Sequence, residues 1–107
     1  VPVCFDAKEC HTDTFPMQNV HRHQMEFMEG YETQGGVSFL LIYFSHRQEC
    51  YYLRFAELKK YWDRMKAGGP KHFKYAELEK EFFVPCGNGA AIHYLVTLQK
   101  DLKERKQ

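Results

Sequence analysis

Apolar residues recur along the chain in two patterns that predict its secondary structure. Residues 3–8 are largely apolar, and residues 36–44, GVSFLLIYF, form an almost unbroken apolar run. A strand that is buried on both faces of a sheet has this second pattern. The segment ECYYLRF at 49–55 follows after a short polar turn, which predicts a hairpin with the strand before it.

Apolar residues at helical spacing predict four further elements. We expect the first helix to be capped by Asn19 and to end near Gln34, before two glycines. The other three helices are expected at 56–69, 74–82 and 91–107. Between these elements, residues 11–19 are expected to be loop and residues 82–89 irregular or briefly extended. The order β-α-β-β-α-α-α predicts an α/β fold in which helices flank a mixed β-sheet.

Length and composition predict one packed domain over residues 1–107. Hydrophobic residues make up 44% of the chain and aromatic residues 16%, which favours a packed domain and argues against disorder. The net charge of +1 gives no indication for or against nucleic acid. No apolar run approaches the ~20 residues that span a bilayer, so we expect no membrane contact.

Cysteine usage gives a weaker indication of cellular location. Four cysteines stand at positions 4, 10, 50 and 86, and no CxxC pair occurs, which argues against a zinc ribbon. With no signal peptide, we expect free thiols and a cytoplasmic location.

The first predicted strand holds two charged residues, Asp6 and Lys8, in the stretch VCFDAKEC. Alternate residues of a strand share a face, so these two side chains should lie on one side, roughly 7 Å apart at the backbone. Phe5 and Ala7 should then point into the core. The acid could hold a divalent cation, and the lysine could orient water or hold a phosphate. A surface salt bridge is the simpler interpretation.

Two other stretches have candidate chemistry. His21 and Gln24 stand three apart and face one side of the expected helix, whereas His23 is displaced from them. A metal site from both histidines would need non-helical geometry, so we interpret them as polar groups at a helix start that favours phosphate. Trp62 could stack on a nucleobase, but its spacing with Leu58 and Met65 favours a core position.

Several stretches together resemble the RecU-type Holliday junction resolvases. They are FDAKE, FPMQNVHRHQMEFM, GGVSFLLIYF, YYL, YWDR and GGPK, in this order from Val3 to about Leu98. These resolvases are DNA endonucleases of Gram-positive bacteria in the PD-(D/E)xK nuclease superfamily. The resemblance implies a restriction-endonuclease-like core that cuts four-way junctions by symmetric nicking, as a homodimer with Mg²⁺ or Mn²⁺, in recombination and DNA repair.

The resemblance also implies roles for individual residues. Asp6 would be a metal ligand, the Ala7 carbonyl would complete the metal shell, and Lys8 would position water or stabilise the pentacovalent phosphate. Gln24 would lie at the scissile phosphate and is counted with Asp6 and Lys8 as catalytic. The candidate DNA contacts are His21, His23 and Lys71.

One part of the family pattern has no counterpart in this sequence. Relatives have an upstream N-terminal helix, first strands, a stalk and another metal-binding Asp. We therefore expect this chain alone to bind metal poorly and to cut poorly or not at all, with a missing segment or a partner chain completing the site. Two alternatives stay open: a non-catalytic DNA-binding or dimerisation relative, and another PD-(D/E)xK nuclease that acts on duplex DNA.

Overall fold

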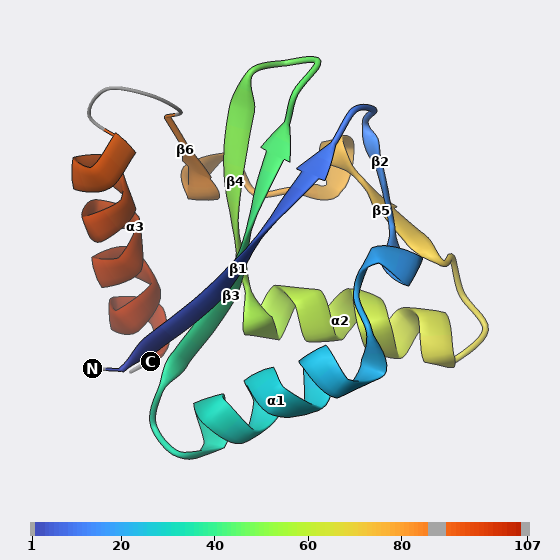
Figure 1. Cartoon of the computed structure of the whole chain (residues 1–107), viewed down its shortest axis with the longest axis horizontal. Coiled ribbons are helices and arrows are strands. Elements are labelled where there is room, and N and C mark those ends of the chain that lie inside the picture. The colour runs from blue at the N-terminus through green and yellow to red at the C-terminus, as the bar shows by residue number, and fades with distance from the viewer. Residues whose placement is uncertain (1, 86–89, 106–107) are drawn as a thin grey trace.

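A four-stranded mixed sheet lies at the centre of the computed structural model, which describes residues 2–85 and 90–105 (Figure 1). The strand order is β1-β3-β4-β6. β1 pairs with β3 in parallel, and β3–β4 and β4–β6 are antiparallel. The strands are β1 (Val3–Cys10), β3 (Val37–Phe44), β4 (Glu49–Arg54) and β6 (Phe83–Val84).

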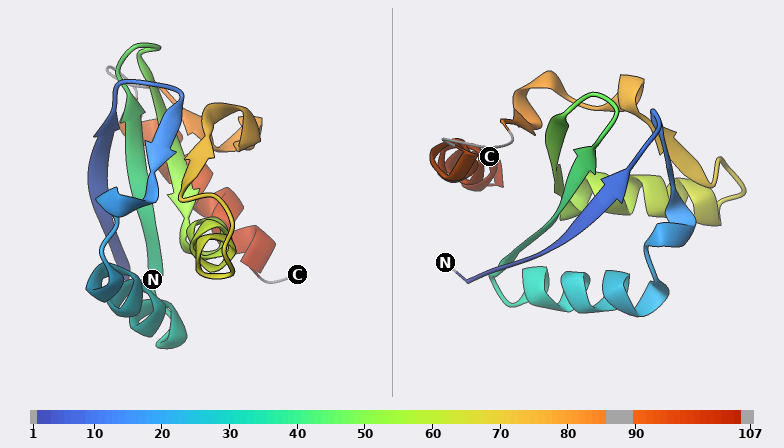
Figure 2. Two further views of the ribbon diagram at one scale, coloured as in Figure 1. Left: turned by 90° about the vertical axis from the view of Figure 1, so that its right-hand side faces the viewer. Right: turned by 45° about the horizontal axis from the view of Figure 1, so that its top comes forward.

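Three helices flank this sheet, so the predicted α/β fold with a mixed sheet is confirmed. α1 (Arg22–Thr33) lies in the crossover from β1 to β3, a connection that parallel strands require. α2 (Phe55–Lys66) packs near α1, and α3 (Ala90–Arg105) lies beside β6 with an ion pair from Arg105 to Glu32 near the end of α1 (Figures 1 and 2). No helix within the described ranges combines the length and apolar character that crossing a bilayer requires.

A two-stranded ribbon lies beside the main sheet. It pairs β2 (Thr14–Pro16) with β5 (His72–Lys74) in antiparallel fashion. Phe15 and Phe73 face each other in this ribbon and stack with ring centroids 4.9 Å apart, and both are fully buried. The sequence predicted loop for residues 11–19, and a three-residue strand is too short to show a period.

The core is built around β3, as its unbroken apolar pattern predicted. Phe39 and Leu40 are both fully buried although they point to opposite faces, so both faces of β3 are covered. Phe39 stacks on Tyr52 of β4 with ring centroids 4.1 Å apart, and the Tyr52 hydroxyl donates to Asp101 of α3. These contacts attach α3 to the face of the sheet that bears Phe39.

One predicted helix start and one predicted helix are wrong. The N-cap residue of α1 is His21 and the helix begins at Arg22, whereas Asn19 was the predicted cap; Met17–Asn19 instead forms a separate 3₁₀ turn. The helix expected at 74–82 is replaced by two 3₁₀ turns, Tyr75–Glu77 and Lys80–Phe82. Leu78 between them is extended, with φ −83° and ψ 154°. In both places, turns replace helix where tertiary packing overrides a weak local preference.

The cysteine prediction is right in part. Cys4 and Cys10 have free thiols. Cys50 is disulfide-bonded, so the prediction of a free thiol is wrong there. Cys86 lies outside the described residues.

Candidate active site

β1 is an edge strand, and this position decides how its side chains are exposed. Within the described residues β1 pairs with β3 alone. Phe5 stacks on the buried Phe39 with ring centroids 5.3 Å apart, yet 53% of its surface is exposed, and Ala7 is exposed as well. The prediction that Phe5 and Ala7 point into the core is therefore wrong, because at the edge of the sheet this face is only partly covered.

The other prediction for this strand, that Asp6 and Lys8 share a face, is confirmed. The Lys8 ammonium lies 3.2 Å from Asp6 Oδ2. About half of the Asp6 side chain is exposed, against 20% of the Lys8 side chain. The carboxylate is therefore accessible to a ligand, while the protein surface surrounds much of the lysine stem.

α1 brings a third predicted residue to this pair. The Ser38 hydroxyl of β3 donates to the Met28 carbonyl of α1 (3.3 Å), one of the contacts that hold this helix against the sheet. Four residues before Met28, on the same side of the helix, Gln24 Nε2 donates to Asp6 Oδ2 at 2.9 Å. Asp6, Lys8 and Gln24 thus form one contiguous cluster.

The surroundings of Asp6 favour its ionised form. The hydrogen bond from Gln24 makes the largest contribution in lowering the pKa of Asp6 below its ordinary value, against the opposing effect of partial burial. Lys8 and the Ala7 amide, which donates to Asp6 Oδ1 at 2.9 Å, lower it further. Asp6 is therefore a carboxylate at neutral pH, able to accept hydrogen bonds or to bind a cation.

An open groove lies beside Lys8, and we call it the Lys8 groove. His21 lines it, at the N-cap position of α1, where no side chain caps the free amides of the first turn. His23 stacks on His21 with ring centroids 5.6 Å apart. The groove has a volume of about 650 Å³ and is lined by Ala7, Lys8, Glu9, Gln18, Asn19 and His21.

The uncapped amides and the Lys8 ammonium are the groups of this groove that suit an anion such as phosphate, and the Glu9 carboxylate is the lining group that opposes one. Gln18 and Asn19 line the groove, but the sequence did not predict either as a site residue; Asn19 was predicted only as a helix cap. Their one signal as site residues was their place in the motif that contains both histidines.

Lys71, the remaining predicted DNA contact, does not line the Lys8 groove. Its backbone carbonyl accepts a hydrogen bond from the Met17 amide (2.9 Å), which places it beside the start of the 3₁₀ turn that Met17 begins. Lys71 instead lines a separate apolar hollow together with Gln18, a residue that both depressions share.

The side chains around Asp6 meet the requirements of Mg²⁺ only in part. In the part of the chain that the structure describes, no group of three or more His, Cys, Asp or Glu side chains is arranged to hold a metal. Mg²⁺ prefers octahedral oxygen ligands, keeps several waters and often binds through one or two carboxylates plus substrate phosphate. The exposed Asp6 carboxylate therefore fits as one ligand of such an ion, and it does not complete a site.

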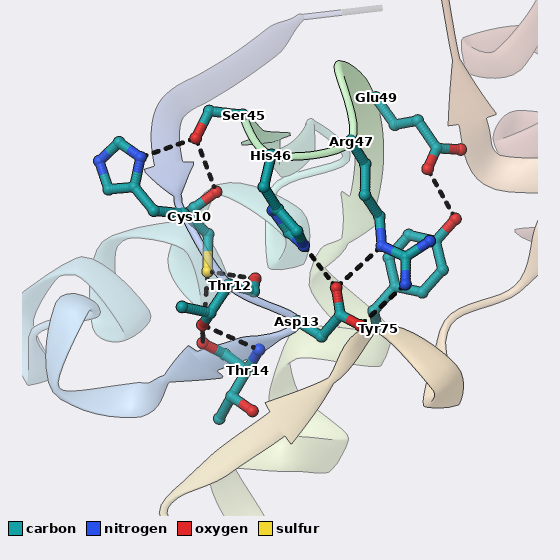
Figure 3. A network of polar contacts seen from close by, with 10 residues as sticks. Cys10, Thr12, Asp13, Thr14, Ser45, His46, Arg47, Glu49 and Tyr75 are labelled. Carbon is teal, nitrogen blue, oxygen red and sulfur yellow. Dashed lines mark hydrogen bonds and ion pairs between the residues drawn. The ribbon is translucent and has the colours of Figure 1, made fainter.

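A polar clamp that the sequence did not predict holds the chain just beyond β1 (Figure 3). Asp13 accepts two hydrogen bonds of 2.8 Å from the Arg47 guanidinium and lies 2.5 Å from His46 Nε2. Arg47 in turn lies 3.9 Å above the Tyr75 ring centroid. The clamp joins the loop after β1 to the β3–β4 turn and so fixes the end of the strand that bears Asp6 and Lys8.

An acid and a lysine paired on one strand of an α/β sheet, with an amide and a helix N-terminus beside them, fit the class of DNA endonucleases that the sequence motifs indicated. The family model of RecU, Recombination protein U, matches residues 1–100. The chain therefore belongs to the RecU family.

Individual relatives agree with this assignment. Three proteins named Holliday junction resolvase RecU are similar to the chain: one from Levilactobacillus brevis is 44% identical over 78 residues, one from Staphylococcus saprophyticus 38% over 98, and one from Listeria welshimeri 34% over 98. The match to the Levilactobacillus brevis protein covers 72% of this chain and 39% of that relative. The other two matches each cover 90% of this chain, and they cover 47% of the Staphylococcus saprophyticus protein and 49% of the Listeria welshimeri protein. The chain thus spans half or less of the length of these relatives.

Proposed function

We propose that this chain contributes the acid–lysine part of the active site of a Holliday junction endonuclease that depends on Mg²⁺ or Mn²⁺. The observation that supports this most directly is the half-exposed Asp6 carboxylate in contact with both Lys8 and Gln24, in a chain of the RecU family. The proposed substrate, a four-way DNA junction, comes from the relatives' name.

The proposed reaction is hydrolysis of a phosphodiester by in-line attack of water. The water oxygen forms a bond to phosphorus, the bond to the 3′ oxygen breaks, and a 5′-phosphate and a 3′-hydroxyl remain. A bound divalent cation would neutralise charge that develops on the phosphate. Asp6 would hold that cation, with the Ala7 carbonyl as a further ligand.

The other residues of the cluster would act on water and phosphate. Lys8, with its ammonium beside Asp6, would orient the attacking water or stabilise the extra negative charge of the pentacovalent phosphate. Gln24, which lines a hollow beside Asp6, would keep the Asp6 carboxylate ionised and oriented, and its amide would also approach the scissile phosphate.

The DNA backbone would lie in the Lys8 groove. The free amides at the start of α1 and the His21 ring would supply hydrogen-bond donors in this groove, His23 would supply one beside it, and Lys71 would contact phosphate farther along. These contacts carry no base specificity, which agrees with recognition of a branched shape rather than a sequence.

The rest of the site would come from outside the described residues. The outer edge of β1, which no described strand pairs, is where an upstream segment or a partner chain could add a strand and a second carboxylate. The restriction-endonuclease-like core, the homodimer and the cytoplasmic location are part of the same proposal.

Cleavage of a synthetic four-way junction tests the proposal. The chain is assayed alone and joined to the upstream half of the Levilactobacillus brevis relative. We expect efficient nicking with Mg²⁺ only from the joined protein, and a loss of at least about 100-fold with Asp6→Asn or Lys8→Ala. Lys80→Ala, which removes an exposed lysine from another part of the fold, is the matched control. Equal rates for Lys8→Ala and the parent would contradict the role given to Lys8.

A non-catalytic DNA-binding or dimerisation relative is the second candidate. The lack of a three-ligand group in the described residues favours it. Calorimetry with Mn²⁺ on the joined protein separates the two: this candidate predicts no specific metal binding, and junction binding that survives Asp6→Asn. A nuclease for linear duplex, the remaining alternative, would cut duplex as fast as the junction.

A further inference from the structure

Lys71 lines a largely apolar hollow whose residues, apart from Lys71 itself, have no role in the proposed hydrolysis. We call it the Trp62 hollow, and its volume is about 230 Å³. α2 supplies one wall and the segment after β2 the other, with polar side chains at the rim. The residues that matter here are Trp62 and Met65 from α2, Pro16 and Met17 opposite, and Gln18 and Lys71 at the rim.

The interior of this hollow is apolar, and its residues are held in place by burial and by a backbone hydrogen bond. Met17 is almost fully buried, and its amide is fixed by the Lys71 carbonyl. Trp62 and Met65 are half-buried and pack against the core, as their helical spacing predicted, but each leaves part of its surface facing the hollow. An aromatic ring with an accessible surface beside a thioether is suited to a flat, apolar ligand.

The rim of the hollow is positively charged. Lys71 is the one charged residue that lines it, and this ammonium has no ion pair with any residue in the described ranges. The Lys66 ammonium lies 5.7 Å from the centroid of the Trp62 ring, but it lines a separate depression together with Glu26 and Asp63. A ligand that combines a flat ring with a negative charge complements both features.

Gln18 lines both the Trp62 hollow and the Lys8 groove, so the two depressions adjoin. A DNA strand with one phosphate in the Lys8 groove would have its neighbouring nucleotides beside Gln18. The Gln18 amide both donates and accepts hydrogen bonds, so it can meet the polar edge of any base.

We propose that the Trp62 hollow receives one unpaired nucleobase of the DNA strand held in the Lys8 groove, stacked on Trp62, with Lys71 on the adjoining phosphate. This inference rests on the proposed function for the presence of DNA, and it adds a base-binding site to it. Strands that exchange at a junction offer unpaired bases more readily than uninterrupted duplex does, because such a base costs less to unstack.

Trp62 is the only tryptophan of the chain, so its fluorescence reports directly on the hollow. The 107-residue chain is titrated without divalent metal, first with single-stranded oligothymidylate and then with an abasic strand of the same length and charge. We expect saturable quenching by oligothymidylate, little quenching by the abasic strand, and at least about fivefold weaker binding of the abasic strand in fluorescence anisotropy with labelled DNA. Equal quenching by both strands, or binding without quenching, would overturn the proposal.

Variants separate stacking from charge. Trp62→Leu should weaken binding of oligothymidylate at least about fivefold but leave the abasic strand unchanged, whereas Trp62→Phe should retain most of the affinity. Lys71→Ala should weaken both strands, and Lys80→Ala neither. Circular dichroism checks that each variant folds. If Trp62→Phe binds as poorly as a folded Trp62→Leu, stacking is not the interaction and the proposal fails.

Two further measurements distinguish DNA in the hollow from a second copy of the chain, and base binding from cleavage. Fluorescence that changes with protein concentration in the absence of DNA would assign the hollow to a second copy and overturn the proposal. Lys8→Ala should lose cleavage but still show quenching by oligothymidylate. The two proposals can therefore fail separately: a protein that does not cleave can still bind the base, and a protein that does not bind the base can still cleave.

Discussion

Gln24 of α1 and Asp6 of β1 are joined by a hydrogen bond of 2.9 Å from the side-chain amide to the carboxylate oxygen that also faces Lys8. The acid is therefore positioned from two sides, by a residue on its own strand and by one on the helix that crosses the sheet. This relationship makes Gln24 a residue that acts through Asp6, in addition to any contact it makes with DNA.

Removal of the Gln24 amide should raise the pKa of Asp6. The hydrogen bond from Gln24 is the largest single effect that lowers this pKa, and Lys8 lowers it further through a hydrogen bond and through its charge. Gln24→Ala should therefore raise the pKa of Asp6, as measured by carbon-detected NMR titration of the carboxyl group. Gln34→Ala, at the other end of α1, is the control and should leave this pKa unchanged. An unchanged pKa of Asp6 in Gln24→Ala would contradict the positioning role of Gln24.

The acid–lysine pair could be predicted from the sequence because alternation along a strand is a local rule. Gln24 was placed beside this pair by the family resemblance alone. Periodicity could not position it over Asp6, because that depends on how α1 packs on the sheet, and the sequence predicted Asn19 as the N-cap residue where the structure has His21. The burial of Phe5 was predicted wrongly for a related reason. Periodicity gives the face of the sheet on which a side chain lies, whereas the burial of that side chain depends on which elements cover the face.

The clamp shown in Figure 3 and the Trp62 hollow were also beyond prediction. Asp13 and Arg47 are 34 residues apart and meet only because β1 and the β3–β4 turn end at the same edge of the fold. Trp62 was assigned correctly to the core by its spacing. Its partial exposure depends on the turn at Met17–Asn19, which no pattern indicated.

The buried carboxylate of Glu57 should contribute strongly to stability. It is 5% exposed and accepts hydrogen bonds of 2.7 Å from the hydroxyls of Tyr51 and Tyr61. Glu57→Ala would leave both hydroxyls without this acceptor and should lower the free energy of unfolding by about 3 kcal/mol, measured by urea denaturation. Glu81→Ala, at an exposed position, should change it by less than about 0.5 kcal/mol. A similar small effect of both substitutions would show that the network is not stabilising.

The isolated chain should self-associate through the edge of β1. This strand is eight residues long, and within the described part of the chain its outer edge lacks a partner, beside a half-exposed Phe5. Such an edge can pair with another strand. Phe5→Lys should therefore reduce self-association, measured by sedimentation velocity. Phe27→Lys, which places the same charge on an exposed aromatic position of α1, should reduce it less. Equal effects would indicate general surface hydrophobicity instead of pairing at the edge.

The clamp at Asp13 should make stability depend on pH in acid. The Arg47 guanidinium, and after it His46, hold the pKa of Asp13 well below its ordinary value of 3.8. A carboxyl whose pKa is lower in the folded state stabilises the fold above pH 3.8 and loses this contribution as the pH falls further. The free energies of unfolding of the parent and of Asp13→Asn should therefore differ at pH 6 and converge in strong acid, as measured by urea denaturation over a pH series. A difference between them that stays constant through the acid range would mean that Asp13 acts through packing and not through its charge.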